Sequence, residues 1–312
     1  MNITLPDGSV RELNAGSTGL DLALDIGPGL AKAAIAVSVN GQQKDLSDPI
    51  NEDSKVSIIT IDSPEGLEIM RHTLTAQVLA RAVKNLYPDT KLAIGPTITD
   101  GFYYDFEFKN PISPDDLQKI EKEMEKIIDT KSSITKVLYS KEDAIEIFKK
   151  NNETYKESII QESDQVDNFQ LYYQDNNEFV DLCRGPHLPN LKQIGSFKLT
   201  KLAGAYWKGD SKNKMLTRIY GTAWKNDKDL NSYLHSIEEA EKRDHRKLGK
   251  EMKLFHFQEE APGMVFWHPN GWTIYRLLQN FIRNKLQEYD YHEINTPQVV
   301  DRKLWEASGH WD

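Results

Sequence analysis

The sequence predicts an α+β protein of more than one domain, and three observations support that fold class. Strand-like and helix-like patterns alternate irregularly through residues 1–225, rather than in regular strand–helix pairs. Two hairpin signals surround one short helical pattern near the start, and a long charged helical pattern lies around residue 240. The length of 312 residues agrees with about two domains of roughly 150 residues each.

Residues 1–62 predict a small β-grasp domain. A Pro-Asp-Gly turn at 6–8 and an Asn-Gly turn at 40–41 each connect two strand-like runs. GLDLALDI lies between them and has a short helical pattern closed by Gly-Pro-Gly, and VSIITI is a final β-rich run. The following turn-rich residues, 63–66, predict a linker.

Residues 63–225 predict a second domain of the α+β class. Apolar residues recur at helical spacing over 66–87, and further helices are expected over 114–128, with Ser113 as N-cap, and over 140–150. The runs GFYYDFEF, FQLYYQ and EFVDLC are β-rich, so strands and helices are interspersed through this domain.

The last part of the sequence predicts a linker helix over 226–253 and then an incomplete domain over 254–312. This domain contains a helical pattern over 272–289 and a β run that ends at Pro297. About sixty residues are too few to bury so much aromatic surface alone, so we expect the start of a larger domain.

The composition restricts the class of protein. Hydrophobic residues make up 38% of the chain, enough for real cores, but the longest apolar runs are too short to span a bilayer. The start MNITLPDGSV has neither the basic nor the apolar part of a signal peptide, and the one cysteine cannot form an internal disulfide. We therefore expect a cytoplasmic protein with no membrane partner.

The charge pattern restricts how this protein could bind a nucleic acid. A net charge of −9 argues against wholesale coating of a nucleic acid. Residues 198–218 and 242–253 are nevertheless locally basic and are candidates for phosphate contacts, although solvated faces are the commoner meaning. The chain has neither the P-loop motif nor the dinucleotide-binding Gly-x-Gly-x-x-Gly motif.

The strongest candidate site is the segment DLCRGPH, residues 181–187, which contains the only cysteine. If EFVDLC is a strand, Asp181 and Cys183 face the same side, and His187 follows across a tight turn. Such a set suits a metal site, a thiol nucleophile, or a pocket that holds a substrate and a water molecule. Taken alone, a buried Cys183 beside a structural His187 is the commoner meaning.

His72, near the start of the first long helix, is a further candidate. A second histidine four residues later would place two ligands on one helix face, but Ala76 stands there and Gln77 follows. Glutamine is a poor transition-metal ligand and no base at neutral pH, so we expect a metal-free pocket. Tyr103 and Tyr104 could line a cleft or simply pack, and Lys156 could contact a phosphate or ribose, although a lone lysine is usually solvated.

Longer motifs resemble bacterial threonyl-tRNA synthetase, a class II aminoacyl-tRNA synthetase. They include RHTLTAQ, KLAIGP, DGFYYDF, DLCRGPH, LAGAYWKGDSKNKMLTRIYGTAW, KRDHRKLGKEMKLF, EEAPGMVFWHPNGWTIYR and DRKLWEASGHWD, and extend over essentially the whole chain. The resemblance implies a TGS-type β-grasp domain at 1–62 and an editing domain at 63–225. It also implies a linker helix at 226–253 and the start of a class II antiparallel-sheet catalytic domain, with motif 1, at 254–312.

The resemblance implies threonine--tRNA ligase activity in a longer, homodimeric enzyme. Its partners would be tRNA(Thr), threonine and ATP, and its cofactors magnesium and zinc. The ATP motifs and zinc ligands of the family are expected beyond residue 312, so no cofactor and no aminoacylation are expected from this portion. The editing part would hydrolyse serine wrongly attached to tRNA(Thr), because binding alone separates side chains that differ by one methyl by only about 10–200-fold.

The resemblance also implies the site residues. Those expected in the hydrolytic pocket are His72, Asp181, Cys183 and His187, and those expected to contact substrate are Lys156, Gln77 and Tyr104. The expected chemistry is attack of water on the aminoacyl ester. A neutral histidine holds or deprotonates the water, the terminal ribose hydroxyl of the tRNA can assist, and Cys183 shapes the pocket.

One departure from the family leaves alternatives open. The family pattern is H-x-x-x-H, whereas this chain has one extra residue after His72 and Gln77 where the second histidine is expected. Editing is then weakened or lost, which leaves a tRNA-binding portion without catalysis, or Gln77 positions the water while His187 supplies basicity. A free-standing editing protein is a third alternative, disfavoured by the class II-like segment after residue 254.

Overall fold

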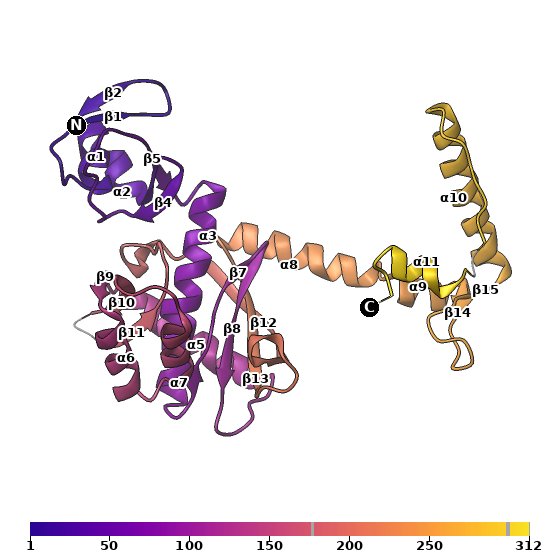
Figure 1. The fold of residues 1–312 in the computed structure, drawn as a ribbon. Helices are drawn as coiled ribbons and strands as arrows, with labels where there is room; N and C mark the ends of the chain where they lie inside the picture. Colours follow the sequence, from indigo (N-terminus) through magenta and orange to yellow (C-terminus); the bar gives the residue numbers. More distant parts are fainter. Residues whose placement is uncertain (176–177, 298–299, 312) are drawn as a thin grey trace. The chain divides into compact units, whose positions relative to one another are not determined.

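The structure is a computed structural model that describes residues 1–175, 178–297 and 300–311 (Figure 1). The chain forms two compact units, Met1–Tyr233 and Leu234–Asp312. Within the described ranges, no helix combines the length and the apolar character needed to cross a membrane.

The first sixty residues form a five-stranded sheet with two short helices. The strand order is β2-β1-β5-β3-β4, and β1 pairs with β5 in parallel while the other neighbours are antiparallel. Apolar side chains such as Ile3, Leu22 and Val37 fill its core. The elements are β1 (Asn2–Thr4), β2 (Val10–Glu12), α1 (Gly19–Ile26), α2 (Pro28–Ala33), β3 (Ala34–Val39), β4 (Gln42–Asp45) and β5 (Ser54–Thr60).

The predicted long helix is present, but its middle is π-helical. It consists of α3 (Pro64–Thr73), η1 (Leu74–Leu79) and α4 (Ala80–Leu86) in direct succession. Ser63 caps its start by accepting a hydrogen bond from the backbone N–H of Gly66. A π-helical turn holds an additional residue compared with an α-helical turn, and such turns are frequent at functional sites.

Two further sheets belong to the first unit. One has the order β12-β13-β8-β6, with β7 also paired to β8, and the other has the order β11-β10-β9. Their strands are β6 (Lys91–Leu92), β7 (Thr97–Ile98), β8 (Gly101–Glu107), β9 (Ile134–Tyr139), β10 (Phe169–Gln174), β11 (Phe179–Leu182), β12 (Ser196–Tyr206) and β13 (Met215–Trp224). The helices are α5 (Asp116–Asp129), α6 (Lys141–Lys150) and α7 (Thr154–Glu162), with short 3₁₀ turns at Leu191–Gln193 and Trp207–Gly209.

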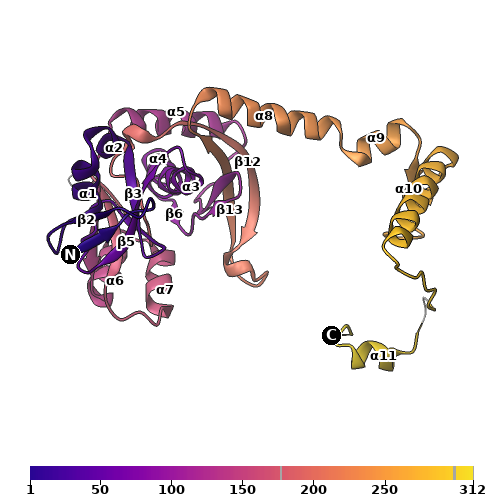
Figure 2. The same cartoon turned by 90° about the horizontal axis from the view of Figure 1, so that it is seen from above.

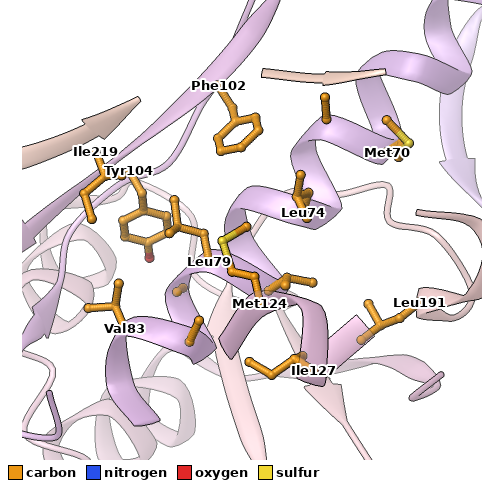
Figure 3. Packing of buried hydrophobic residues seen from close by; sticks show 14 of the residues in the cluster. Met70, Leu74, Leu79, Val83, Phe102, Tyr104, Met124, Ile127, Leu191 and Ile219 are labelled. Atoms are coloured by element: carbon orange, nitrogen blue, oxygen red, sulfur yellow. The ribbon is translucent and has the colours of Figure 1, made fainter. Parts of the chain in front are cut away.

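The main core of this unit lies between the long helix and the sheet that contains β8. Figure 3 shows Phe102, Tyr104 and Ile219 pointing from the sheet toward Leu74 and Leu79 of the π-helical segment. Figure 2 shows α3 beside β13. The helix that carries His72 is therefore held by a buried apolar surface.

Two details of the predicted helices differ. Helix α5 begins at Asp116 with Asp115 as N-cap, while the N–H and hydroxyl of Ser113 donate to the Asp116 carboxylate. The single linker helix predicted over 226–253 is wrong, because the structure has α8 (Asp227–Lys242) and α9 (His245–Glu251). Asp244 breaks the helix by capping α9, with its carboxylate accepting from the Arg246 N–H.

The second unit contains little sheet. Its elements after α9 are β14 (Phe255–His256), β15 (Phe266–Trp267), α10 (Pro269–Glu288) and α11 (Arg302–Ala307), and among the described residues β14 pairs only with β15. The predicted β run ending at Pro297 is wrong, since residues 290–297 form no strand; residues 298–299 and Asp312 lie outside the described part. A two-stranded ribbon cannot bury a helix face, and apolar residues of α10 remain exposed.

Candidate active site

A cavity of about 470 Å³, here called the site cavity, lies in the first unit. Its walls are formed by residues from the long helix, the segment between β6 and β7, strand β8, helix α7 and the loop after it, strand β10, and the end of β11 with the residues that follow it. They are His72, Ala76, Ile94, Gly95, Pro96, Tyr104, Lys156, Ile159, Ser163, Gln165, Phe169, Gln170, Asp181, Leu182, Cys183 and Arg184. Five of the seven predicted site residues therefore line one cavity, although they come from widely separated parts of the chain.

A buried ion pair forms one wall of the site cavity. Lys156 Nζ of α7 lies 2.6 Å from Asp181 Oδ1 of β11, and both side chains are at least nine-tenths buried. The Tyr104 hydroxyl donates to Asp181 Oδ2 at 3.1 Å, and the Leu182 N–H donates to Asp181 Oδ1 at 2.8 Å. Each carboxylate oxygen thus has a partner, which burial of a charge requires.

Burial also changes the acidity of these groups. Removal from water raises the pKa of Asp181 above its ordinary value, although the Lys156 ammonium acts in the opposite direction. Burial beside the Asp181 carboxylate likewise raises the pKa of Tyr104 well above its ordinary value. Tyr104 therefore remains a protonated hydrogen-bond donor at neutral pH.

His72 and Cys183 meet at the cavity surface. His72 Nε2 lies 2.8 Å from Cys183 Sγ, and the His72 ring stacks on the His187 ring with centroids 4.7 Å apart. Burial lowers the pKa of His72 below its ordinary value of 6.5, despite the carboxylates of Asp181 and Asp45. The imidazole of His72 is therefore neutral at pH 7, the form that can accept a proton.

His187 lies behind His72 and does not line the site cavity. Its Nδ1 lies 3.1 Å from the hydroxyl of Thr73, and that hydroxyl donates its own hydrogen to the Ile69 carbonyl at 2.9 Å. A hydrogen on Nδ1 would complete this contact, and the tautomer with its hydrogen on Nδ1 has a lone pair on Nε2. This Nε2 atom is buried and has no hydrogen-bond partner among the described residues.

The three side chains could together hold a metal ion. One ligand atom from each of His72, Cys183 and His187 lies within 4.8 Å of the others, and within the described ranges no other group of this kind occurs. Two imidazole nitrogens and a thiolate suit zinc, and a free lone pair on His187 Nε2 fits that role. The predicted metal-free pocket therefore remains a prediction.

The π-helical turn decides which side chain follows His72 around the helix. Ala76 lines the site cavity, whereas Gln77 is fully buried and does not line it. The Gln77 side-chain oxygen instead accepts a hydrogen bond from Gln174 Nε2 of β10 at 3.1 Å. The predicted role of Gln77 in substrate binding would require this side chain to turn into the cavity.

Asp45 supports the loop of Cys183 and His187 from the first domain. Its Oδ1 accepts from the His187 backbone N–H at 2.8 Å, and its Oδ2 accepts from the Tyr172 hydroxyl at 2.7 Å. Lys136 Nζ also lies 2.8 Å from Asp45 Oδ2. Sequence reasoning missed Asp45, because no local pattern links it to a segment more than 130 residues away.

The basic segment 198–218 is largely neutralised by acidic neighbours. Lys198 pairs with Glu121 at 2.9 Å, and Arg218 makes two hydrogen bonds to the Asp105 carboxylate at 2.7 and 2.8 Å. Lys208 and Lys214 also form ion pairs, with Glu162 and Glu107. The predicted phosphate contacts of this segment would therefore compete with existing ion pairs.

Comparison with known proteins identifies two domains. Residues 1–60 match the TGS domain model, and residues 170–220 match the model described as "Threonyl and Alanyl tRNA synthetase second additional domain". Over 310 residues, the chain is 55% identical to the threonine--tRNA ligase of Hahella chejuensis. The matched region covers 99% of this chain and 48% of that protein. The chain resembles threonyl-tRNA synthetases.

Other threonine--tRNA ligases match equally broadly. Those of Prochlorococcus marinus and Maricaulis maris are each 53% identical, over 99% and 100% of this chain and 48% of each relative. The chain thus spans about half the length of the curated relatives it matches. The resemblance to threonyl-tRNA synthetase predicted from the motifs is confirmed, and a TGS domain and an editing-type domain are both present.

Proposed function

We propose that the site cavity hydrolyses the ester that joins serine to tRNA(Thr), as the editing part of a threonyl-tRNA synthetase. The observation that carries this proposal is the meeting of a neutral His72 imidazole with the buried Lys156–Asp181 pair in one cavity. Its volume of about 470 Å³ lies within the range of small-ligand sites. An aminoacylated terminal nucleoside is a ligand of suitable size.

The side chains suggest distinct roles in ester hydrolysis. His72 accepts a proton from a water molecule as the water oxygen attacks the ester carbonyl carbon. The Lys156 ammonium stabilises the negative charge that develops on the carbonyl oxygen, and Asp181 holds the ammonium in place. The carbon–oxygen bond to the ribose then breaks, and the proton passes to the departing ribose oxygen.

Cys183 and His187 have positioning roles in this proposal. Cys183 Sγ lies within hydrogen-bond reach of His72 Nε2 and orients that ring by accepting the Nε2 hydrogen, so that Nδ1 keeps the lone pair that takes the proton from water, while His187 stacks on the far side. Hydrolysis by water needs no acyl-enzyme. Detection of a seryl thioester on Cys183 by mass spectrometry would contradict this assignment.

The first experiment compares hydrolysis of seryl-tRNA(Thr) by the wild type and by His72→Ala, with threonyl-tRNA(Thr) as control substrate. Loss of a general base lowers the rate by about 10²–10⁴-fold, and the exposed His235→Ala variant is the matched control. We expect selective hydrolysis of the seryl ester, lost only in His72→Ala. Equal rates for both histidine variants would reject the proposal.

One observation favours a second candidate function, a tRNA-binding portion without catalysis. The residue one turn after His72 on the cavity wall is Ala76, which offers no second polar group. Under this alternative, the chain binds tRNA(Thr) but hydrolyses seryl-tRNA(Thr) no faster than His72→Ala does.

For the longer protein we propose threonine--tRNA ligase activity. Its substrates would be threonine, ATP and tRNA(Thr), its cofactors magnesium and zinc, and its form a homodimer in the cytoplasm. Identity above 50% to ligases of about twice this length supports that proposal. Attachment of labelled threonine to tRNA(Thr) by the longer protein, dependent on ATP, is the direct test.

A further inference from the structure

A second cavity of about 340 Å³, here called the neighbouring cavity, adjoins the site cavity. Gln170 and Arg184 line both cavities, so the two share a wall. The remaining walls come from β4 and the loop after it, from β9, and from the segment that precedes β10. A ligand with an extended chain that leaves the site cavity past Arg184 would enter the neighbouring cavity.

Two cations at the neighbouring cavity are free. The side chains of Lys44 and Arg184 make no hydrogen bond or ion pair with any residue in the described part of the chain. The third cation, Lys136, is already paired with the carboxylates of Asp45 and Asp48. The cavity therefore retains positive charge that is available to a ligand.

We propose that the neighbouring cavity binds the backbone phosphates of the single-stranded 3′ end of the tRNA, just before its aminoacylated terminal nucleotide. This inference rests on the proposed function, which places the ester in the site cavity. Arg184 at the shared wall contacts the phosphate that leaves the site cavity, and Lys44 contacts a phosphate further along. Arginine and lysine are the usual partners of nucleic-acid phosphates.

The lining favours backbone binding over recognition of bases. Among the residues that line the neighbouring cavity there is no aromatic side chain on which a base could stack. Amide side chains are present instead, and these can donate to phosphate and sugar oxygens; they are Gln42, Gln43, Asn168 and Gln170. The cations of segment 198–218 are less suitable, because acidic neighbours already hold several of them.

The test separates a substrate with phosphates from one without. Seryl-adenosine carries the scissile ester but no preceding phosphate, whereas seryl-tRNA(Thr) carries both. For Lys44→Gln we expect KM for seryl-tRNA(Thr) to rise about tenfold with kcat unchanged, and both constants for seryl-adenosine to stay as in the wild type. The exposed Lys55→Gln, on the same domain, is the matched control.

Salt dependence gives a second readout. A phosphate contact in a single strand contributes about 0.7 to the slope of log affinity against log salt. Lys44→Gln should lower that slope for seryl-tRNA(Thr), and Lys44→Gln with Arg184→Gln should lower it further. A KM for seryl-tRNA(Thr) that stays unchanged in Lys44→Gln would overturn the inference, as would an equal rise for seryl-adenosine.

Failure of the proposed phosphate site can be distinguished from failure of the proposed hydrolysis. If the wild type hydrolyses neither ester, the proposed function fails, and direct binding of a short single-stranded RNA with the 3′-terminal tRNA sequence then tests the neighbouring cavity. Weaker binding by the double variant than by Lys55→Gln supports the phosphate site. Equal binding by both overturns it.

Discussion

Large apolar side chains are buried in the first unit of the chain and exposed in the second. In the first unit, Phe102, Tyr104 and Phe106 are fully buried beside the long helix. In the second unit, Leu277 and Phe281 of α10 are 65% and 57% exposed. The comparison teaches that the first unit builds a complete core around the candidate site, while α10 presents an apolar face that the described residues of its own unit do not cover.

The strongest test of this difference in burial is to truncate one phenylalanine in each unit. Phe106→Ala empties a fully buried position and should lower the free energy of unfolding of the first unit by about 3–5 kcal/mol. Phe281→Ala changes an exposed position and should alter stability by less than about 0.5 kcal/mol. Urea denaturation measures both, and similar losses would contradict the division into a packed and an open region.

The next largest effect concerns buried and exposed ion pairs. Lys156→Met leaves the Asp181 carboxylate buried without a cation, which should cost about 3–5 kcal/mol at pH 7. The matched Lys208→Met breaks a pair whose members are 42% and 57% exposed and should lower the stability far less, because solvent screens this pair. The loss in Lys156→Met should shrink at acid pH, because protonation of Asp181 removes the buried charge. A loss independent of pH would indicate a packing defect instead.

A smaller effect is expected at the contact between the first domain and the site loop. Asp45→Ala removes the acceptor of the His187 N–H and the Tyr172 hydroxyl, and should cost about 1–3 kcal/mol. We also expect Asp45→Ala to lower kcat for ester hydrolysis. Asp45→Asn keeps one side-chain oxygen and should therefore retain part of the stability and part of kcat. Asp25→Ala, which breaks only an exposed 3.5 Å pair with Arg11, is the control. Unchanged hydrolysis in Asp45→Ala would show that this contact does not position the site.

The smallest effect is the pH dependence of hydrolysis. Because burial lowers the pKa of His72, its neutral form persists below the ordinary value of 6.5. The rate at pH 6.5 should therefore remain above half its maximum and fall only at lower pH. The same shift affects stability. At a pH between the lowered pKa of His72 in the folded protein and its ordinary value of 6.5 in the unfolded chain, the unfolded chain binds more protons, so the free energy of unfolding rises with pH. A rate midpoint above 6.5 would contradict the assignment of His72 as base.

The elements predicted from local patterns were found largely as expected. The hairpins at 6–8 and 40–41 follow from turn chemistry, and the long helix follows from its apolar spacing. The joint position of Asp181 and Cys183 in the site cavity follows from the alternation of side chains along a strand. The wrong strand before Pro297 shows the limit, because a β-rich run pairs only if a partner strand is available.

The sequence predicts one extra residue after His72 relative to the family pattern, but it does not predict the shape of the helix there. In a regular α-helix, one added residue rotates everything after it by about 100°. Such a rotation would turn Leu79 and Val83 out of the core; in the structure both are buried, and a π-helical turn such as Leu74–Leu79 has room for an additional residue. The same turn places Ala76, rather than Gln77, on the cavity wall.

The sequence by itself determined the local elements and the chemical inventory of the site, because turn residues, periodicity and residue type act over a few positions. Only the tertiary structure decided which partner each charge has. Lys156 lies against Asp181, Asp45 reaches the backbone of His187, and Arg184 has no ion-pair partner among the residues that the structure describes. Burial makes those choices, since a charge removed from water is tolerated only beside a partner, and the fold alone determines which groups leave water together.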